Sequence, residues 1–328
     1  MKILVVGGAG YIGSHMVKML LDAGHNVITF DNLSSGFRDA VLGGEFIKGD
    51  LADLAAIDNV FETYQPDAVM HFASYIQVGE SVQDPKKYYI NNFTNTLNLL
   101  NAMVKHQVNN FIFSSTAAVF GEPEYVPIDE IHSKTPLNPY GRSKLMVEHV
   151  LADYERAYGL KSVCLRYFNA AGADPSGLLG ERHEPETHLI PLILQALSGK
   201  RTHISLFGRD YDTPDGTCIR DYIHIVDLCS AHLLALLKLV KDGASMCFNL
   251  GNGEGFSVQE VISAAERVTG KKVKVIEAPR REGDPARLVA DARLAKKALA
   301  WTPVYAELET IIMHAWQWEA KSHINPDE

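Results

Sequence analysis

Short apolar runs alternate with helical patterns through the first half of the chain. The apolar runs cover residues 3–6, 27–30, 45–47, 68–72, 110–114 and 162–168, and the helical patterns cover 12–23, 53–63, 85–106 and 139–158. This rhythm predicts strand–helix–strand units and a parallel sheet. Runs such as DAVMHF do not alternate strictly between apolar and polar residues, which is typical of strands covered by helices on both faces. We therefore expect a doubly wound α/β fold.

The chain changes character after Asn169. Residues 170–191 and 208–222 are dense in glycine, proline and charge, and they predict long loops that follow strand ends and cover a ligand. A chain of 328 residues exceeds the size at which one core keeps growing, so we expect two packed subdomains. Composition does not mark the boundary, which we place near residue 170.

Composition and charge exclude several classes of protein. Hydrophobic residues make up 46% and charged residues 22% of the chain, as in an ordinary globular protein. The formal net charge of −9 argues against a nucleic-acid surface. The four cysteines form no C-x-x-C pair and predict reduced thiols in a cytoplasmic protein. No secretion signal is visible, and His232 and Lys238 interrupt the most apolar helical stretch, so we expect no membrane span.

The stretch GGAGYIGSH, residues 7–15, lies between an apolar run and a helical pattern. Gly7 would permit a tight turn, Gly10 a close approach to a pyrophosphate, and Gly13 close packing of the helix on the sheet. A plain strand-to-helix turn is the alternative. Asp31 ends the next apolar run at the spacing where a carboxylate binds a ribose 2′-hydroxyl, although an aspartate there also caps turns. Together they predict NAD rather than NADP.

Tyr140 and Lys144 form a second candidate constellation. Their four-residue spacing places a phenol and an ammonium on one helix face. We expect Lys144, together with a nicotinamide cation, to lower the pKa of Tyr140 and make it a base; a surface tyrosine beside a surface lysine is the alternative. Ser114, Ser115 and Thr116 end the preceding strand, where one hydroxyl could bind a substrate oxygen or simply cap a turn.

These motifs resemble those of the extended short-chain dehydrogenase/reductases. The similarity continues through DNLS, HFA, VGESV, YYINN, PYGRSKLMVE, LRYFNAAGADPSG, IRDYIHIVDL, NLGNGEGFSV and PRREGDPA, and so covers essentially the whole chain. It implies a Rossmann-like NAD-binding domain over residues 1–170 with a returning segment near 220–250. It also implies a smaller α/β C-terminal domain over 171–328 that binds a UDP-sugar, and a homodimer.

The resemblance also assigns roles to individual residues. It implies that Tyr140 takes the proton of the sugar 4-hydroxyl, that Lys144 is its electrostatic partner and a ribose ligand, and that Thr116 orients O4. The implied NAD contacts are Gly7, Gly10, Tyr11, Ile12, Gly13, Asp31, Asn32, Asp50, Leu51, Phe72, Ala73, Asn91, Tyr140, Lys144 and Phe168. The implied UDP-sugar contacts are Thr116, Tyr140, Asn169, Leu189, Phe207, Arg220, Arg281 and Asp284. Guanidinium groups suit a diphosphate, although for either arginine taken alone a solvated or salt-bridged side chain is the preferred interpretation.

The activity that the resemblance implies is the interconversion of UDP-glucose and UDP-galactose, in galactose metabolism, by transient NAD-dependent oxidation at sugar C4. The alternative is inversion at C4 of UDP-GlcNAc, UDP-glucuronate or a UDP-pentose. Three residues depart from the best-known bacterial pattern: Ile76 replaces a lysine, His188 an asparagine, and Leu288 a tyrosine that narrows the sugar pocket. Because leucine is smaller than tyrosine, we hypothesise that N-acetylated sugars also enter.

Other functions fit the sequence less well. Nucleotide-sugar dehydratases and decarboxylases carry acidic residues directly after the strand-end threonine, where this chain has Ala117 and Ala118. An NAD-sensing regulator on the same fold would not need Tyr140 and Lys144. The stretch RHEPETH, with His183, Glu184, Glu186 and His188, lies in a proline-interrupted loop without helical ligand spacing. We interpret it as loop polarity and expect no metal.

Overall fold

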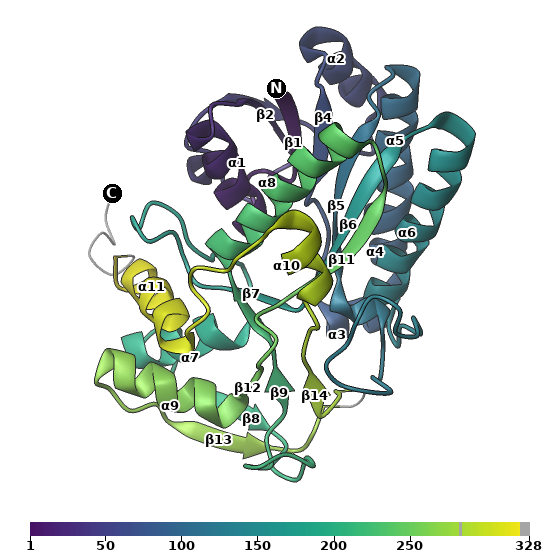
Figure 1. The fold of residues 1–328 in the computed structure, drawn as a ribbon. Coiled ribbons are helices and arrows are strands. Elements are labelled where there is room, and N and C mark those ends of the chain that lie inside the picture. The colour runs from purple at the N-terminus through teal and green to yellow at the C-terminus, as the bar shows by residue number, and fades with distance from the viewer. Residues whose placement is uncertain (282–283, 322–328) are drawn as a thin grey trace.

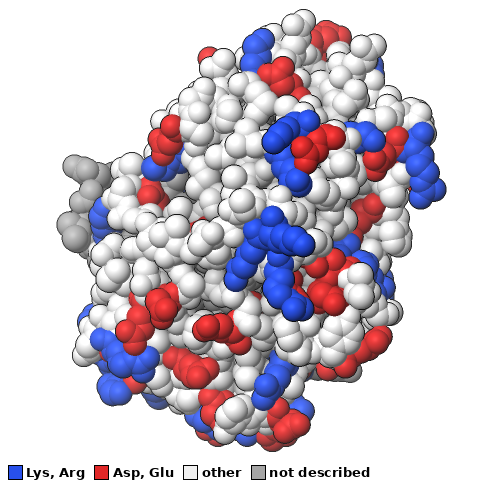
Figure 2. Space-filling view, in the orientation of Figure 1, with Lys and Arg blue, Asp and Glu red and all other residues white. Residues whose placement is uncertain are grey.

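The structure is a computed structural model that describes residues 1–281 and 284–321. A large sheet flanked by helices forms one part, and a smaller part built around α7, α9 and α11 lies against it (Figure 1). Residues 282 and 283, within the PRREGDPA motif, lie outside the described residues, as do residues 322–328. Acidic and basic side chains are interspersed over the face shown in Figure 2.

The large sheet has seven strands in the order β11-β6-β5-β4-β1-β2-β3, all paired in parallel. The strands are β1 (Lys2–Val6), β2 (Asn26–Asp31), β3 (Glu45–Lys48), β4 (Ala68–His71), β5 (Asn110–Thr116), β6 (Lys161–Tyr167) and β11 (Met246–Leu250). The strand order runs outward from β1 in both directions, so the topological switch point lies between β1 and β4. This confirms the predicted doubly wound α/β fold.

Both faces of the sheet are apolar and covered, as the unalternating strand sequences predict. Ile3 and Val5 of β1 face a core that includes α1 and α8, whereas Leu4 and Val6 face a second core with α2, α5 and α6. The covering helices are α1 (Tyr11–Asp22), α2 (Leu54–Tyr64), α5 (Asn95–Lys105), α6 (Pro139–Tyr158), α8 (Ile225–Asp242) and α10 (Arg293–Leu299). Among the described helices, none combines the length and the apolar character needed to cross a bilayer.

The helix predicted over residues 85–106 is confirmed, although its hydrogen-bonding pattern changes along its length. It consists of α4 (Pro85–Tyr88), a π-helical turn (Tyr89–Thr94) and α5, and α3 (Val78–Gln83) precedes it. Asp84 begins α4, because its side chain accepts a hydrogen bond from the backbone N–H of Lys87. The apolar period does not reveal a π-helical turn, which adds a residue without interrupting the helix.

The smaller part contains short sheets and three longer helices. Its strands are β7 (Asn169–Ala171), β8 (Ile204–Phe207), β9 (Ile219–Arg220), β10 (Tyr222–His224), β12 (Phe256–Ser257), β13 (Val275–Ala278) and β14 (Arg287–Leu288), and its helices are α7 (Leu189–Ser198), α9 (Val258–Thr269) and α11 (Leu308–Lys321). Ile193 of α7, Val261 of α9 and Ile311 of α11 share one core. The chain thus leaves the large sheet after β6 and returns to it through α8 and β11. The division into domains at residue 170 stays a prediction.

Candidate active site

The glycine turn lies between β1 and α1. Gly7 has a φ of +80°, and a Cβ there would come within 2.4 Å of the Ala73 nitrogen. A Cβ on Gly13 would come within 2.0 Å of the Gly7 oxygen, so both positions need glycine for packing. A Cβ on Gly10 would instead find no heavy atom nearer than 3.5 Å. The space in front of Gly10, at the N-terminus of α1, fits the pyrophosphate of a dinucleotide.

Asp31 lies beside this turn at the end of β2. Its Oδ2 accepts the N–H of Ala9 at 2.9 Å, and its Oδ1 accepts the N–H of Leu33 at 2.8 Å. Burial raises the pKa of the Asp31 carboxyl, and the two backbone hydrogen bonds act in the opposite direction. Asn32 donates to Asp50 at 2.8 Å, which joins the ends of β2 and β3. A carboxylate at this place fits an adenosine ribose.

The other residues implied for the cofactor lie along the same edge of the sheet. Tyr11 and Ile12 form the first turn of α1, Leu51 follows β3, Phe72 and Ala73 follow β4, Asn91 lies in the π-helical turn, and Phe168 follows β6. Because the carboxyl ends of parallel strands meet at one edge, the topology brings these segments together. Their individual contacts with NAD stay predictions, and the set fits that cofactor.

Tyr140, Thr116 and Lys144 meet at the carboxyl end of β5. The helix α6 begins at Pro139, and the Asn138 side chain accepts the N–H of Gly141 at 2.9 Å, so Tyr140 lies in the first turn. Tyr140 is buried and hydrogen-bonded to Thr116. Lys144, one turn later, donates from Nζ to the Ser114 carbonyl at 2.8 Å. The i, i+4 spacing thus directs both side chains to one strand end.

Burial of Tyr140 opposes the predicted lowering of its pKa, and the lowering by Lys144 together with a nicotinamide cation stays a prediction. Burial raises the pKa of the phenol, and only the hydrogen bond with Thr116 opposes this effect. Burial also lowers the pKa of Lys144 to about 7, against the attraction of Glu148. Burial disfavours both the phenolate of Tyr140 and the ammonium of Lys144. The spacing of the two residues in the sequence does not reveal this burial. The prediction also included a nicotinamide cation, which lowers the pKa of Tyr140 only when the cofactor is bound.

A buried ionic network, which the sequence did not predict, supports this strand end. Glu148, one turn after Lys144, accepts from the Ser115 hydroxyl at 2.6 Å and from Arg166 Nε and Nη2 at 2.9 and 2.6 Å. The side chains of Glu148 and Arg166 are 6% and 4% exposed. Arg166 lies opposite Ser115 in the β5–β6 register. The only sequence signal was Arg166 within the apolar run 162–168, because Glu148 is one of several charged residues on an amphipathic helix.

The residues implied for the UDP-sugar gather in the smaller part. Arg220 of β9 forms an ion pair with Asp284, and the Arg281 guanidinium lies 4.0 Å from the centre of the Phe207 ring. Asn169 donates to the carbonyl of Asp221, next to Arg220, at 3.0 Å. Leu189 is the first residue of α7. The structure brings two guanidinium groups to one region, and the contacts of these residues with a ligand stay predictions.

The three departures from the bacterial pattern are spread around the site. Leu288 pairs with Arg220 in the β14–β9 register and packs with Phe168 against a small core that contains Ala117. It therefore lies between the strand end that carries Thr116 and Arg220, for which a UDP-sugar contact stays a prediction. Ile76 is 37% exposed just before α3, and His188 precedes the first residue of α7.

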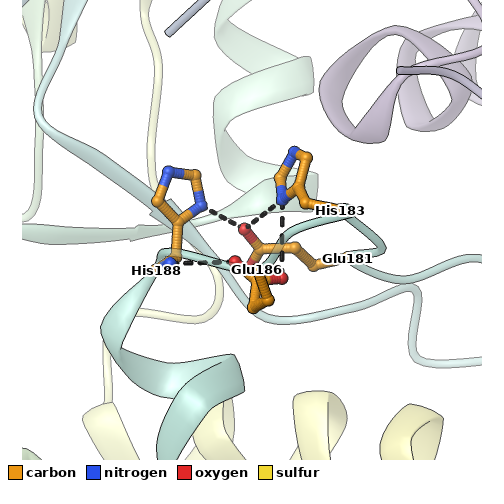
Figure 3. Close-up of side chains that lie close together, drawn as sticks. All are labelled: Glu181, His183, Glu186 and His188. Atoms are coloured by element: carbon orange, nitrogen blue, oxygen red, sulfur yellow. Dashed lines mark hydrogen bonds and ion pairs between the residues drawn. The ribbon is translucent and has the colours of Figure 1, made fainter. Parts of the chain in front are cut away.

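The loop that carries RHEPETH is more ordered than the polarity of its sequence suggested. Glu181, His183, Glu186 and His188 converge, whereas Glu184 is not part of the group (Figure 3). The sequence signal was the repeated spacing of glutamate and histidine from 181 to 188. A loop has no regular period, so the spacing of these residues did not predict that their side chains converge.

A doubly wound sheet with this glycine turn and a carboxylate at the end of β2 defines the chain as a dinucleotide-binding protein of the Rossmann type. It belongs to the NAD dependent epimerase/dehydratase family, whose model matches residues 3–251. The match therefore begins in β1 and ends just after β11.

Named relatives are similar over nearly the whole chain. A UDP-glucose 4-epimerase of Halalkalibacterium halodurans is 52% identical, over 98% of this chain and 96% of that protein. The crystal structure of UDP-glucose 4-epimerase from Brucella ovis in complex with NAD is 50% identical and covers 96% of this chain and 97% of its own, with a TM-score of 0.94. The UDP-Glc/GlcNAc 4-epimerase of Campylobacter jejuni is 46% identical and covers 98% and 99%, with a TM-score of 0.86.

Proposed function

We propose that the chain is an NAD-dependent isomerase that interconverts UDP-glucose and UDP-galactose. The observation that carries the proposal is the meeting of Tyr140, Thr116 and Lys144 at the carboxyl end of β5, on the sheet edge that also holds the glycine turn. Relatives about half identical to the chain, over nearly its full length, are UDP-glucose 4-epimerases.

In the mechanism, bound NAD supplies the reversible removal of a hydride from the sugar C4. Tyr140 takes the proton of the 4-hydroxyl and returns it later, as a general base and then a general acid. Thr116, already hydrogen-bonded to Tyr140, holds the oxygen that loses the proton. Lys144, anchored on the Ser114 carbonyl, holds a positive charge near the phenolate when protonated.

Inversion at C4 requires that the sugar presents each of its faces in turn. Arg220 and Arg281 bind the diphosphate, and guanidinium groups suit it because they donate paired hydrogen bonds. Binding energy then comes from the part of the substrate that does not react, and the sugar itself stays free to turn. Asp284, which pairs with Arg220, keeps that guanidinium in place.

Elimination chemistry lacks a catalyst at this site. Nucleotide-sugar dehydratases need an acid next to the strand-end threonine. Here Thr116 is followed by the short helical turn Ala117–Val119, in which Ala117 and Val119 are buried. The site therefore favours proton exchange at O4 over loss of water.

The purified protein, incubated with UDP-galactose and no added cofactor, is expected to form UDP-glucose, because the cofactor is regenerated in each turnover. Chromatographic separation of the products measures this, and the absorbance of reduced nicotinamide is expected to stay low. Formation of a 4-keto-6-deoxy sugar nucleotide would contradict the proposal and favour a dehydratase.

Leu288→Tyr is expected to reduce turnover of UDP-GlcNAc more than turnover of UDP-galactose. The larger ring would occupy space between the Ala117 core and Arg220 that an N-acetyl group needs. The measurement is the ratio of kcat/KM for the two substrates, and we expect a change of about tenfold, within the range for steric discrimination in a pocket. Equal rejection of UDP-GlcNAc by both proteins would remove the argument for a wide pocket.

We also propose that the chain acts as a homodimer in the cytoplasm, in galactose metabolism. The similarity to the extended short-chain dehydrogenase/reductases supports the dimer. The four cysteines support a reducing compartment, because all are free thiols and three of them are buried.

A further inference from the structure

The loop between β7 and α7 brings four metal-ligating side chains together. Glu181, His183, Glu186 and His188 each offer one ligand atom, and these atoms all lie within 4.8 Å of one another. Figure 3 shows the two imidazole rings and the two carboxylates directed toward a common centre. We propose that this cluster binds one divalent transition-metal ion, with zinc as its occupant.

The spacing around His183 is that of ligands around an ion. Its Nδ1 lies 3.4 Å from Glu181 Oε1 and 3.5 Å from Glu186 Oε2. This nitrogen is buried and has no hydrogen-bond partner, since N–H···O bonds are normally about 2.9–3.0 Å long. Tetrahedral zinc with nitrogen and oxygen ligands places neighbouring ligand atoms roughly 3.3–3.6 Å apart. His188 contacts Glu181 directly and is the most exposed of the four, so its ring can turn toward an ion.

Backbone N–H groups hold the Glu186 carboxylate, and a side chain of α11 fixes the main chain at Glu181. Glu186 Oε1 accepts the N–H groups of Thr187 and His188 at 2.7 and 2.8 Å, so its second oxygen faces His183. The Glu181 carbonyl accepts from the Trp318 indole at 3.2 Å, which fixes the start of the loop against α11. Outer hydrogen bonds of this kind orient ligands before a metal binds.

The charges of the cluster also favour a dication. The side chains of Glu181 and Glu186 are 6% and 5% exposed. Among the ion pairs of the described residues, their carboxylates pair only with the two histidines. The nearest guanidinium in the sequence, Arg182, pairs instead with Asp39. A metal binds imidazoles in their neutral form, so in the metal-bound cluster the two buried carboxylates carry two negative charges, which a divalent ion cancels.

The position of the cluster predicts what the ion does. Four protein ligands leave no open position, so the ion is structural rather than catalytic. The His183 ring packs edge to face on Tyr11 of the glycine turn, with 6.3 Å between ring centres. His188 directly precedes Leu189 of α7. The ion would therefore tie the loop between the glycine turn and the first turn of α7, a role that does not depend on the proposed reaction.

Zinc content tests the proposal directly. The NAD-loaded protein is treated with a chelator, equilibrated with zinc chloride, freed of unbound metal and analysed by mass spectrometry for metal. We expect about one zinc per chain, and an X-ray absorption spectrum with nitrogen and oxygen ligands at about 2.0–2.2 Å and no sulfur. Zinc should also raise the Tm of the wild-type protein, because it binds the folded state.

Two ligand variants and one control complete the test. His188→Ala and Glu186→Gln are expected to weaken zinc binding by at least the roughly 100-fold that changes next to a metal site can cost. His106→Ala, which removes a histidine paired with Asp58 at 3.1 Å on another face, should retain the zinc. Absence of stoichiometric zinc from the wild-type protein would overturn the proposal, and so would equal zinc binding by the wild type and both ligand variants.

Discussion

Tyr140→Phe is expected to lower the turnover of UDP-galactose by about 10²–10⁴-fold, the usual contribution of a general acid–base group. The substitution removes only the phenolic oxygen, which is hydrogen-bonded to Thr116. It leaves the glycine turn and Asp31 unchanged. NAD should therefore stay bound, and the loss should appear in kcat and kcat/KM alike.

Two quantities are measured for the purified variant and for the wild type: the steady-state rate and the content of bound NAD. Tyr154→Phe is the matched control, because Tyr154 lies on the same helix and its hydroxyl donates to Asn101 at 2.7 Å, on the surface. We expect the control to keep the wild-type rate. A near-normal rate for Tyr140→Phe would exclude Tyr140 as the base.

Glu148→Gln is expected to reduce the free energy of unfolding by about 3–5 kcal/mol, the usual cost of leaving a buried charge without its partner. Arg166 would keep its guanidinium in a site where its side chain is 4% exposed. The Ser115 hydroxyl would lose a carboxylate acceptor, so the end of β5 should become less ordered. Urea unfolding of the NAD-loaded protein, followed by circular dichroism, measures the change.

Glu309→Gln is the control for this substitution. Glu309 accepts from Arg267 Nε at 2.8 Å, but both side chains are more than half exposed, at 57% and 61%. Exposed pairs contribute about 0–1 kcal/mol, so the control should unfold nearly as the wild type does. If both variants lost the same small amount, the Glu148–Arg166 pair would not support the site.

The sequence predicted β1 to β6 and the helices between them because apolar strands and amphipathic helices carry a period, whereas β11 was not predicted from any such pattern. It predicted neither the π-helical turn within the 85–106 helix nor the raised pKa of Tyr140. The first depends on local backbone geometry, and the second on burial by segments far away in the chain. The glycine spacing at residues 7–13 predicted the tight turn correctly. Close packing against Ala73 and Gly7 permits only glycine at two of the three positions.

The sequence predicted the candidate site only in part, because spacing along the chain places residues relative to one another only within one regular element. Tyr140 and Lys144 lie on one helix, so their spacing decides their placement. Arg220 and Asp284 come from separate segments, and only the similarity to a family suggested that they belong together. Glu181 and His188 lie in a loop, where the path of the backbone rather than any period sets the contact.

The late return of the chain to its large sheet has a consequence during synthesis. Until Leu250 has emerged from the ribosome, β6 remains an open edge, because β11 is its outer neighbour. The apolar face beneath α8 is likewise uncovered until Asp242, the last residue of that helix, has emerged. A nascent chain that stalls near residue 170 would expose both surfaces to aggregation. The two parts of the molecule therefore have to mature together rather than one after the other.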